Sequence, residues 1–322
     1  MEDALDQPVL RSRGENNMAF VTVFAIMVAT LAAAPFFIYP VFLMECLCFA
    51  LFACAFNLLI GYVGLVSFGH ALYFGWASYL SAYAAKSLAL SPELAVLIGT
   101  GTAAVLGVIA GVVAIRRQGI YFAMITLALA QMMYFFALRA RFTGGEDGIQ
   151  AVPRGRLFGF FDLSNELTMY AFVLIVVLAA FLLIYRIINS PFGEVLKAIR
   201  ENEQRSVSLG YKTERYKLVA FILSATLAGL AGALKALVFQ LASLTDVHWT
   251  MSGDVVLMTL LGGLGTVFGP VVGAFCVIAL QNYLAPVGQW VLVIQGVIFV
   301  VCVMVFRRGI VGEIAAGLRI RL

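Results

Sequence analysis

The stretch VFLMECLCFALFACAFNLLI, residues 41–60, holds a single charged side chain, that of Glu45. Twenty residues of α-helix span about 30 Å, the thickness of the hydrocarbon core of a bilayer. Because barrel strands would be shorter and would alternate in polarity, this stretch is predicted to cross a membrane as an α-helix. Similar runs recur at 18–38, 94–115, 119–138, 167–185 and 287–306.

The composition of the whole chain agrees with this prediction. Of its 322 residues, 63% are hydrophobic and 12% are charged, whereas about a quarter of the residues in soluble domains are charged. The first apolar run is too long for a removed signal peptide and lacks a clear small-residue cleavage site. We therefore predict an integral membrane protein that keeps its first helix.

Neither the cysteines nor the histidines form a pattern that binds metal. The five cysteines all fall in apolar runs, and the two histidines are too far apart for a zinc pair. We expect no disulfide framework, no metal and no cofactor. The residues concerned are Cys46, Cys48, Cys54, Cys276, Cys302, His70 and His248.

The distribution of basic residues predicts the orientation of the helices. Following the runs from the amino terminus places fifteen Lys and Arg residues on one side and five on the other, with Lys235 inside a helix. By the positive-inside tendency, the first side is cytoplasmic. Seven of the fifteen lie between Arg186 and Lys217, so this segment is predicted to face the cytoplasm.

Two segments are interrupted by glycine. Residues 61–85 begin GYVGLVSFGHALYFG, and GGLGTVFGP (262–270) divides the apolar segment 255–285. Broken helices are tolerated in membranes only where protein or water satisfies the freed backbone groups, and in transporters they often mark the solute route. The alternative is that the glycines merely allow close helix packing.

We predict an all-α fold, a polytopic transmembrane helix bundle of about ten spans with broken helices and both termini cytoplasmic. This count requires both halves of 255–285 to cross. The expected domains are a cytoplasmic tail (1–17), a transmembrane domain (18–310) containing a cytoplasmic loop (190–216), and a second cytoplasmic tail (311–322).

The segment SPFGEVLKAIRENEQRSVSLGYKTERYK, residues 190–217, has the signals of a capped helix. Ser190 suits the N-cap, Pro191 the first turn, Glu194 the positive helix start, and Gly210 a left-handed stop. These signals predict one short helix of about 18 residues. Its charges are mixed in sign, which favours docking in a protein groove over adsorption to lipid, with a solvated loop helix as the alternative.

The segment 190–234 resembles the cytoplasmic loop and following helix of the LivM-type permeases of branched-chain amino acid ABC transporters. The likeness continues in GYVGLVSFGHALYFGWASY (61–79), GIYFAMITLALAQ (119–131), TGGEDGI (143–149) and SGDVVLMTLLGGLGTVFGPVVGA (252–274), in the family's order. It covers most of residues 55–310. RARF (139–142) and the acidic amino-terminal tail match no part of the pattern.

The resemblance implies a permease subunit in the bacterial inner membrane. Its partners would be a second homologous permease, two cytoplasmic ABC ATPase subunits and a periplasmic substrate-binding protein, with no nucleic acid. It also implies that 190–216 is the coupling loop, although Gln204 and Arg205 replace two alanines common in the wider ABC signature. The expected ATPase-coupling residues are Glu194, Ala198, Arg200, Glu201, Glu203, Arg205 and Gly210.

A separate partner for ATP hydrolysis is also expected from the residues themselves. The chain contains no G-x-x-x-x-G-K-[ST] phosphate loop, so we expect a transport subunit and not an enzyme. The alternative class is an ATP-independent secondary transporter or channel, which would leave the capped cytoplasmic helix unexplained. Nothing in the chain identifies the solute, which could be a branched-chain amino acid, another amino acid, urea or an amide.

Polar residues inside apolar segments are candidates for the translocation path, because they are costly in a membrane. Most have a plainer alternative: a position at the outer interface for Glu45, helix bridging for Asn57 and Ser67, and a capping or interface role near the cytoplasmic end for His70. For Asp254 the alternative is a position near an outer helix start, and Lys235 is expected to snorkel outward. The path candidates are Glu45, Asn57, Ser67, His70, Gln131 and Asp254.

Overall fold

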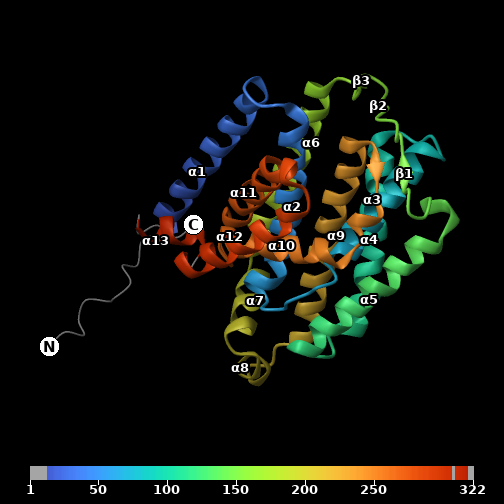
Figure 1. Ribbon diagram of the computed structural model, residues 1–322. Helices are drawn as coiled ribbons and strands as arrows, with labels where there is room; N and C mark the ends of the chain where they lie inside the picture. The colour runs from blue at the N-terminus through green and yellow to red at the C-terminus, as the bar shows by residue number, and fades with distance from the viewer. Residues whose placement is uncertain (1–12, 307–308, 318–322) are drawn as a thin grey trace.

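The computed structural model describes residues 13–306 and 309–317, and nearly all of its regular structure is helical (Figure 1). Residues 1–12, 307–308 and 318–322, which include most of the first predicted tail and the end of the second, lie outside the described residues. The first half contains five long elements: α1 (Arg13–Ala33), α2 (Pro40–Tyr62), α3 (His70–Lys86), α4 (Pro92–Ala114) and α5 (Ile120–Arg139).

The second half has the same number of long elements. They are α6 (Glu166–Ile188), α9 (Thr213–Phe239), α10 (Trp249–Gly262), α11 (Gly269–Leu284) and α12 (Val291–Val305). The short helices are α7 (Pro191–Glu201), α8 (Glu203–Ser208), α13 (Ile310–Gly317), η1 (Ala34–Phe36), η2 (Arg141–Thr143), η3 (Leu244–Asp246) and η4 (Ala285–Trp290). The strands are β1 (Ile149–Gln150), β2 (Arg156–Leu157), β3 (Phe161–Asp162) and β4 (Leu241–Ala242), with β1 antiparallel to β4 and β2 antiparallel to β3.

Five helices are long and apolar enough to cross a membrane: α2, α4, α5, α6 and α9. Three shorter apolar helical segments accompany them, at Phe20–Phe36, Gly269–Leu284 and Val293–Cys302. The predicted apolar runs therefore coincide with helices. The first of these helices begins earlier than expected, since Arg13 and the following residues of the predicted tail already belong to α1.

The two most buried of these long helices, α2 and α9, run antiparallel at the centre of the bundle (Figure 1). The Ser224 hydroxyl of α9 donates a hydrogen bond to the carbonyl of Ala55 in α2, at 2.5 Å. Glycine brings α9 against its other neighbours, because a methyl group at Gly232 would collide with the backbone carbonyl of Phe74 in α3. Small residues thus give this core its close packing.

Two helices begin only part-way through the bundle. The inner break, residues 63–69, leads from the end of α2 back to the start of α3, where His70 meets Ser224 in the middle of α9. The outer break, residues 240–248, leads from the end of α9 back to the start of α10, where Ser252 bonds the Ala71 amide. The predicted interruptions of 61–85 and 255–285 are found as the inner break and as the turn between α10 and α11, whereas the outer break was not predicted.

Within residues 13–306, five helices are thus long and apolar enough to cross a membrane, and α1, α11 and α12 contain the three shorter apolar segments. The order of a long helix, a break and a shorter helix occurs twice, in α2–α3 and, with the opposite direction, in α9–α10. Such inverted repeats are typical of membrane transporters. Near the start of α1, the Phe20 ring stacks on Tyr185 in the last turn of α6, and α13 contacts α10 and α11.

The end of the bundle opposite α7 and α8 carries the outer loop, residues 140–165 (Figure 1). Lys86 donates a hydrogen bond to the Gln150 carbonyl at 2.7 Å, and Arg154 donates one to the Val238 carbonyl near the end of α9, also at 2.7 Å. Basic side chains satisfy exposed carbonyls in this way at helix ends. The pairing of β1 with β4 attaches the same loop to the outer break.

Candidate functional site

The loop between α6 and α9 forms two helices where the sequence pattern predicted one. The Ser190 hydroxyl accepts the Gly193 amide, so the predicted N-cap is confirmed, and Gly210 has the left-handed φ of 88° expected of a helix stop. The prediction of a single helix of about 18 residues is wrong. At Asn202 the backbone is extended, with φ −156° and ψ 100°, and the Asn202 side chain caps α8 by accepting the Arg205 amide.

The loop presents most of its candidate coupling residues to solvent. Leu196 and Ile199 are buried beneath α7, whereas six of the seven candidates are exposed and Glu203 is half-buried. Glu203 pairs with Lys217 at 2.5 Å, and this lysine is nearly buried, with 6% of its side chain exposed. This partly buried pair attaches α8 to the start of α9. The exposed candidates are Glu194, Ala198, Arg200, Glu201, Arg205 and Gly210.

Arg200 reaches from the loop back into the bundle. Its guanidinium donates a hydrogen bond to the Gly61 carbonyl in the last turn of α2. Its side chain also lies against Gly64 in the inner break and Gly265 between α10 and α11, where a Cβ would meet the arginine at 3.2 Å and 3.3 Å. One loop side chain therefore contacts both glycine-rich interruptions.

Asn57 contacts the second of these interruptions from α2. Its amide donates to the Thr266 carbonyl at 2.8 Å, and its oxygen accepts the Gly265 amide at 3.0 Å. Asn57 therefore bridges α2 to the α10–α11 turn, which is the packing role given above as its alternative. Ser67 is fully buried and accepts the Gly69 amide within the inner break.

His70 lies deep in the bundle and not at its cytoplasmic surface, so the expected position is wrong. It is fully buried as the first residue of α3, and its Nε2 is 2.9 Å from the Ser224 hydroxyl. The rings of Phe56, Tyr73 and Phe221 surround it edge-on. The position of His70 was mispredicted because the chain returns into the bundle through the inner break before α3 begins.

Lys235 does not snorkel outward. Its ammonium donates to both Asp246 carboxylate oxygens, at 2.6 Å and 2.7 Å, and 12% of the lysine and 1% of the aspartate side chain are exposed. Asp246 also accepts the Ser243 amide and so completes a capping box. The sequence pattern missed this pair because the partners lie on either side of a break that folds back.

The remaining path candidates lie on separate helices. Gln131 is half-buried on α5. Asp254 lies inside α10, not at its outer start. Glu45 is half-buried on α2. Asn57 and the coupling candidate Arg200 thus contact the same residue, Gly265, whereas Glu45, Gln131 and Asp254 lie on separate helices.

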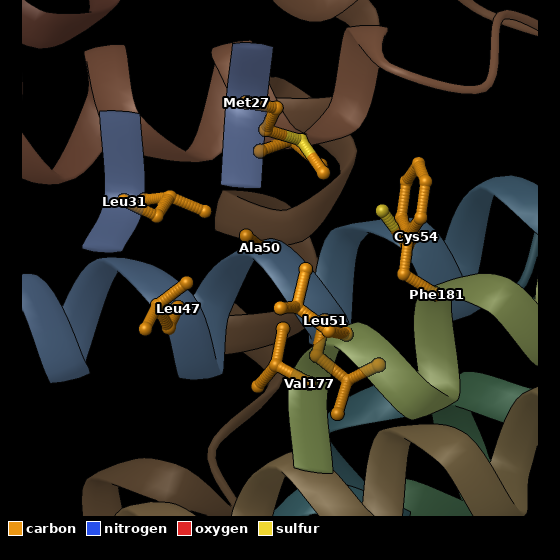
Figure 2. A pocket seen from close by; sticks show the side chains of 10 residues that line it. Met27, Leu31, Leu47, Ala50, Leu51, Cys54, Val177 and Phe181 are labelled. Atoms are coloured by element: carbon orange, nitrogen blue, oxygen red, sulfur yellow. The ribbon is translucent and has the colours of Figure 1, made fainter. Parts of the chain in front are cut away.

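The apolar pocket between α1, α2 and α6 is a poor candidate for a solute site. Figure 2 shows Met27, Leu31, Leu51 and Phe181 pointing into it, and all ten lining side chains are apolar or, for Cys54, a thiol. Such a lining offers hardly any hydrogen-bond partners to a polar solute. The pocket reflects the packing of α1 against its neighbours.

Comparison with known proteins identifies the family. Residues 38–304 match the family model described as the permease component of branched-chain amino acid transport systems. The chain belongs to this family. No solved structure matches the chain.

Three curated relatives illustrate the range of similarity. The LivM permease of the high-affinity branched-chain amino acid transport system of Escherichia coli K12 is 26% identical over 274 residues, 78% of this chain and 64% of the relative. A probable LivM permease of Methanocaldococcus jannaschii is 33% identical over 37% of this chain and 36% of the relative. The ribose import permease RbsC of Bacillus subtilis is 28% identical over 56% of this chain and 58% of the relative.

The match covers 64% of the length of the E. coli relative and of its Salmonella typhimurium counterpart. Family membership and the apolar helices together make this chain a multi-pass protein of the bacterial inner membrane, and its family is one of membrane permease components. The predicted fold class, an all-α polytopic bundle, is confirmed.

Proposed function

We propose that this chain is a permease subunit of an ABC importer. With a second homologous permease it forms the path for branched-chain amino acids or related small polar solutes. Two separate ATPase subunits and a soluble binding protein complete the assembly. The family match, the LivM names of the relatives and the absence of a phosphate-loop motif in the sequence support this assignment.

The observation that carries the proposal is the hydrogen bond from Arg200 to the Gly61 carbonyl. The exposed α7–α8 loop is the surface we assign to ATPase docking, and Arg200 links that surface directly to the inner break. A bistable bundle responds to a partner through a rigid element of this kind. Movement of α7 would thus change the backbone of α2 and the α10–α11 turn together.

A polar pocket beside the loop fits the same role. It is lined by Arg116 and Gln118 from the turn between α4 and α5, by Glu203 and Gln204 from α8, and by Glu214 from α9. Charges of both signs favour a specific protein partner, because complementary charges set register and partner choice. We therefore assign residues 190–216 to the coupling loop and 18–310 to the permease domain.

Purification of the native assembly tests this function. The chain is isolated from solubilised membranes, its companions are identified by mass spectrometry, and solute uptake is measured in vesicles with and without ATP. Recovery of P-loop ATPases and a second permease, together with ATP-dependent uptake, is the expected result. Uptake that persists without ATP and without companions would support a secondary transporter instead.

A further inference from the structure

A small hairpin at the outer end of the bundle carries three exposed phenylalanines. It is formed by β2 and β3, with Leu157 paired to Phe161, and it lies just before α6 in the chain (Figure 1). The exposed fractions of Phe158, Phe160 and Phe161 are 68%, 89% and 61%. A group of exposed apolar side chains of this kind marks a surface that contacts a protein or a membrane.

The base of the hairpin is attached to the bundle, so its level along the helices is defined. The Leu163 side chain is fully buried, and the Leu163 amide donates a hydrogen bond to the Gly155 carbonyl at 3.2 Å. A Cβ at Gly155 would lie 3.2 Å from Pro92, the first residue of α4. The hairpin is therefore held next to the starts of both α4 and α6.

The starts of α4 and α6 lie at the outer boundary of the membrane. Each helix has 23 residues and is apolar enough to cross, and its length of about 34 Å is close to the thickness of the hydrocarbon core. Their outer turns expose the side chains of Leu94, Leu97 and Leu167. The apolar tip of the hairpin thus continues the apolar outer surface of two spanning helices.

A second group of exposed aromatic residues borders the start of α6. Phe36, Phe37 and Tyr39 lie between α1 and α2 and are all exposed. The Tyr39 hydroxyl donates a hydrogen bond to the carboxylate of Glu166, the first residue of α6, at 3.3 Å. Aromatic side chains gather at membrane–water interfaces. Both groups therefore lie at the level where the outer interface is expected.

The backbone at the tip of the hairpin supports a use for its rings. Phe158 has a φ of 50°, in the left-handed region that is unfavourable for a bulky side chain and readily adopted by glycine or asparagine. Residues held in such conformations cluster at functional positions. The exposed Phe158 ring makes little contact within the chain, so the strain favours a contact outside it.

We propose that the β2–β3 hairpin is an interfacial anchor, whose three phenylalanines insert into the outer leaflet beside α4 and α6. Apolar rings at the headgroup boundary hold peripheral segments in this way. The pairing of β1 with β4 attaches the same loop to the outer break, so the anchor holds the outer end of the bundle at a fixed depth. The anchor needs neither a solute nor a partner subunit and is independent of the importer assignment.

Fluorescence quenching tests the depth of the tip in the full chain. Cys276 and Cys302, which are at least partly exposed, are replaced by Ala, and Phe160→Cys is labelled with the environment-sensitive fluorophore NBD. The chain is reconstituted in vesicles of phosphatidylethanolamine and phosphatidylglycerol, with iodide on both sides of the bilayer. Emission at short wavelength, weak quenching by iodide and strong quenching by a nitroxide on the upper acyl chain are expected. Glu146→Cys, at an exposed position of the same loop, is the matched control and should be quenched by iodide.

A second variant shows whether the phenylalanines themselves hold the tip, because NBD is also apolar. Phe158→Ser combined with Phe161→Ser changes two exposed side chains and should raise iodide quenching at position 160 to the level of the control, since each inserted ring favours the membrane by roughly tenfold or more. Shielding that persists without these rings would overturn the anchor. Iodide quenching as strong at position 160 as at position 146 in the chain that keeps both rings would also overturn it. Shielding that appears only after a soluble binding protein is added would replace the anchor with a protein-docking surface.

Discussion

The two breaks are held in different ways. The inner break follows α2 and is contacted by Arg200, which belongs to a loop outside the bundle. The outer break follows α9 and is pinned by the Lys235–Asp246 pair, both members of which lie inside the bundle. A partner that moves α7 can therefore act directly on the inner break, whereas the outer break is attached through the β1–β4 pairing to the outer loop at the opposite end of the bundle.

This difference suggests different roles for the inner and the outer break, although their structures are similar. Each break interrupts a long central helix and returns the chain to mid-depth. The interior ion pair stabilises one backbone arrangement, because separating its charges in a low-dielectric site is costly. Breaking the single hydrogen bond from Arg200 to the Gly61 carbonyl costs less free energy. We expect the inner break to move during transport and the outer break to keep its shape.

Breaking the outer pair should have the largest effect. Asp246→Ala leaves the buried Lys235 ammonium unpaired and should destabilise the protein by about 3–5 kcal/mol. The yield and melting temperature in detergent are measured, with Thr245→Ala, an exposed neighbour, as the control. The double variant Lys235→Met, Asp246→Leu should recover much of the stability. Normal melting of Asp246→Ala alone would show that the pair does not hold the outer break.

Changing the surface of the loop should abolish uptake without unfolding the protein. Glu201→Lys reverses an exposed docking charge, and Gly210→Pro replaces a residue whose φ of 88° proline cannot adopt. Both variants should insert normally and lose uptake. The exposed Lys212→Ala is the matched control. Uptake at the unaltered rate by both variants, at equal expression, would remove the loop from the coupling mechanism.

The pattern of apolar runs was sufficient to predict the fold. It predicted less of the arrangement of the candidate site. Runs such as 41–60 and 167–185 coincide with α2 and α6, because length and hydrophobicity alone decide whether a helix can span. The glycine-rich segments also correctly predicted the inner break and the interruption between α10 and α11, whereas the outer break, residues 240–248, was not predicted. Their depth could not be read from the pattern, so His70 was expected at a surface and lies in the core.

Other errors arose from contacts between residues distant in sequence. Lys235 and Asp246 meet only because the outer break folds back onto α9. Arg200 was grouped with docking residues, yet it contacts Gly61, which is 139 positions away. The division between α7 and α8 had a local signal that was missed, since Asn202 is a favourable N-cap residue followed by Glu203.

Weakening the bridge between α2 and the α10–α11 turn should have an intermediate effect. Asn57→Ala leaves the Gly265 amide and the Thr266 carbonyl unpaired inside the bundle, which should cost about 1–3 kcal/mol. The free energy of unfolding is measured with Asn282→Ala, an exposed position at the end of α11, for comparison. A change below the error of the control would mean that water replaces the lost bonds.

Removing the first cap of the loop should have the smallest effect. Ser190→Ala deletes the side chain that accepts the Gly193 amide and should destabilise α7 by about 1 kcal/mol. Amide hydrogen exchange in the first turn of α7 should accelerate, while exchange in α9 stays constant. Equal acceleration in both helices would indicate a global effect and not a local cap.

The most direct test of the account concerns Arg200 itself. The purified transporter is reconstituted in vesicles, and solute uptake and ATP hydrolysis are measured together for Arg200→Gln and for the exposed control Arg215→Gln. The account predicts that Arg200→Gln assembles with the ATPases and hydrolyses ATP but carries at least about tenfold less solute per ATP, whereas the control does not differ from the unaltered protein. An unchanged ratio of solute to ATP in Arg200→Gln would contradict the claim that this arginine joins the loop to the inner break.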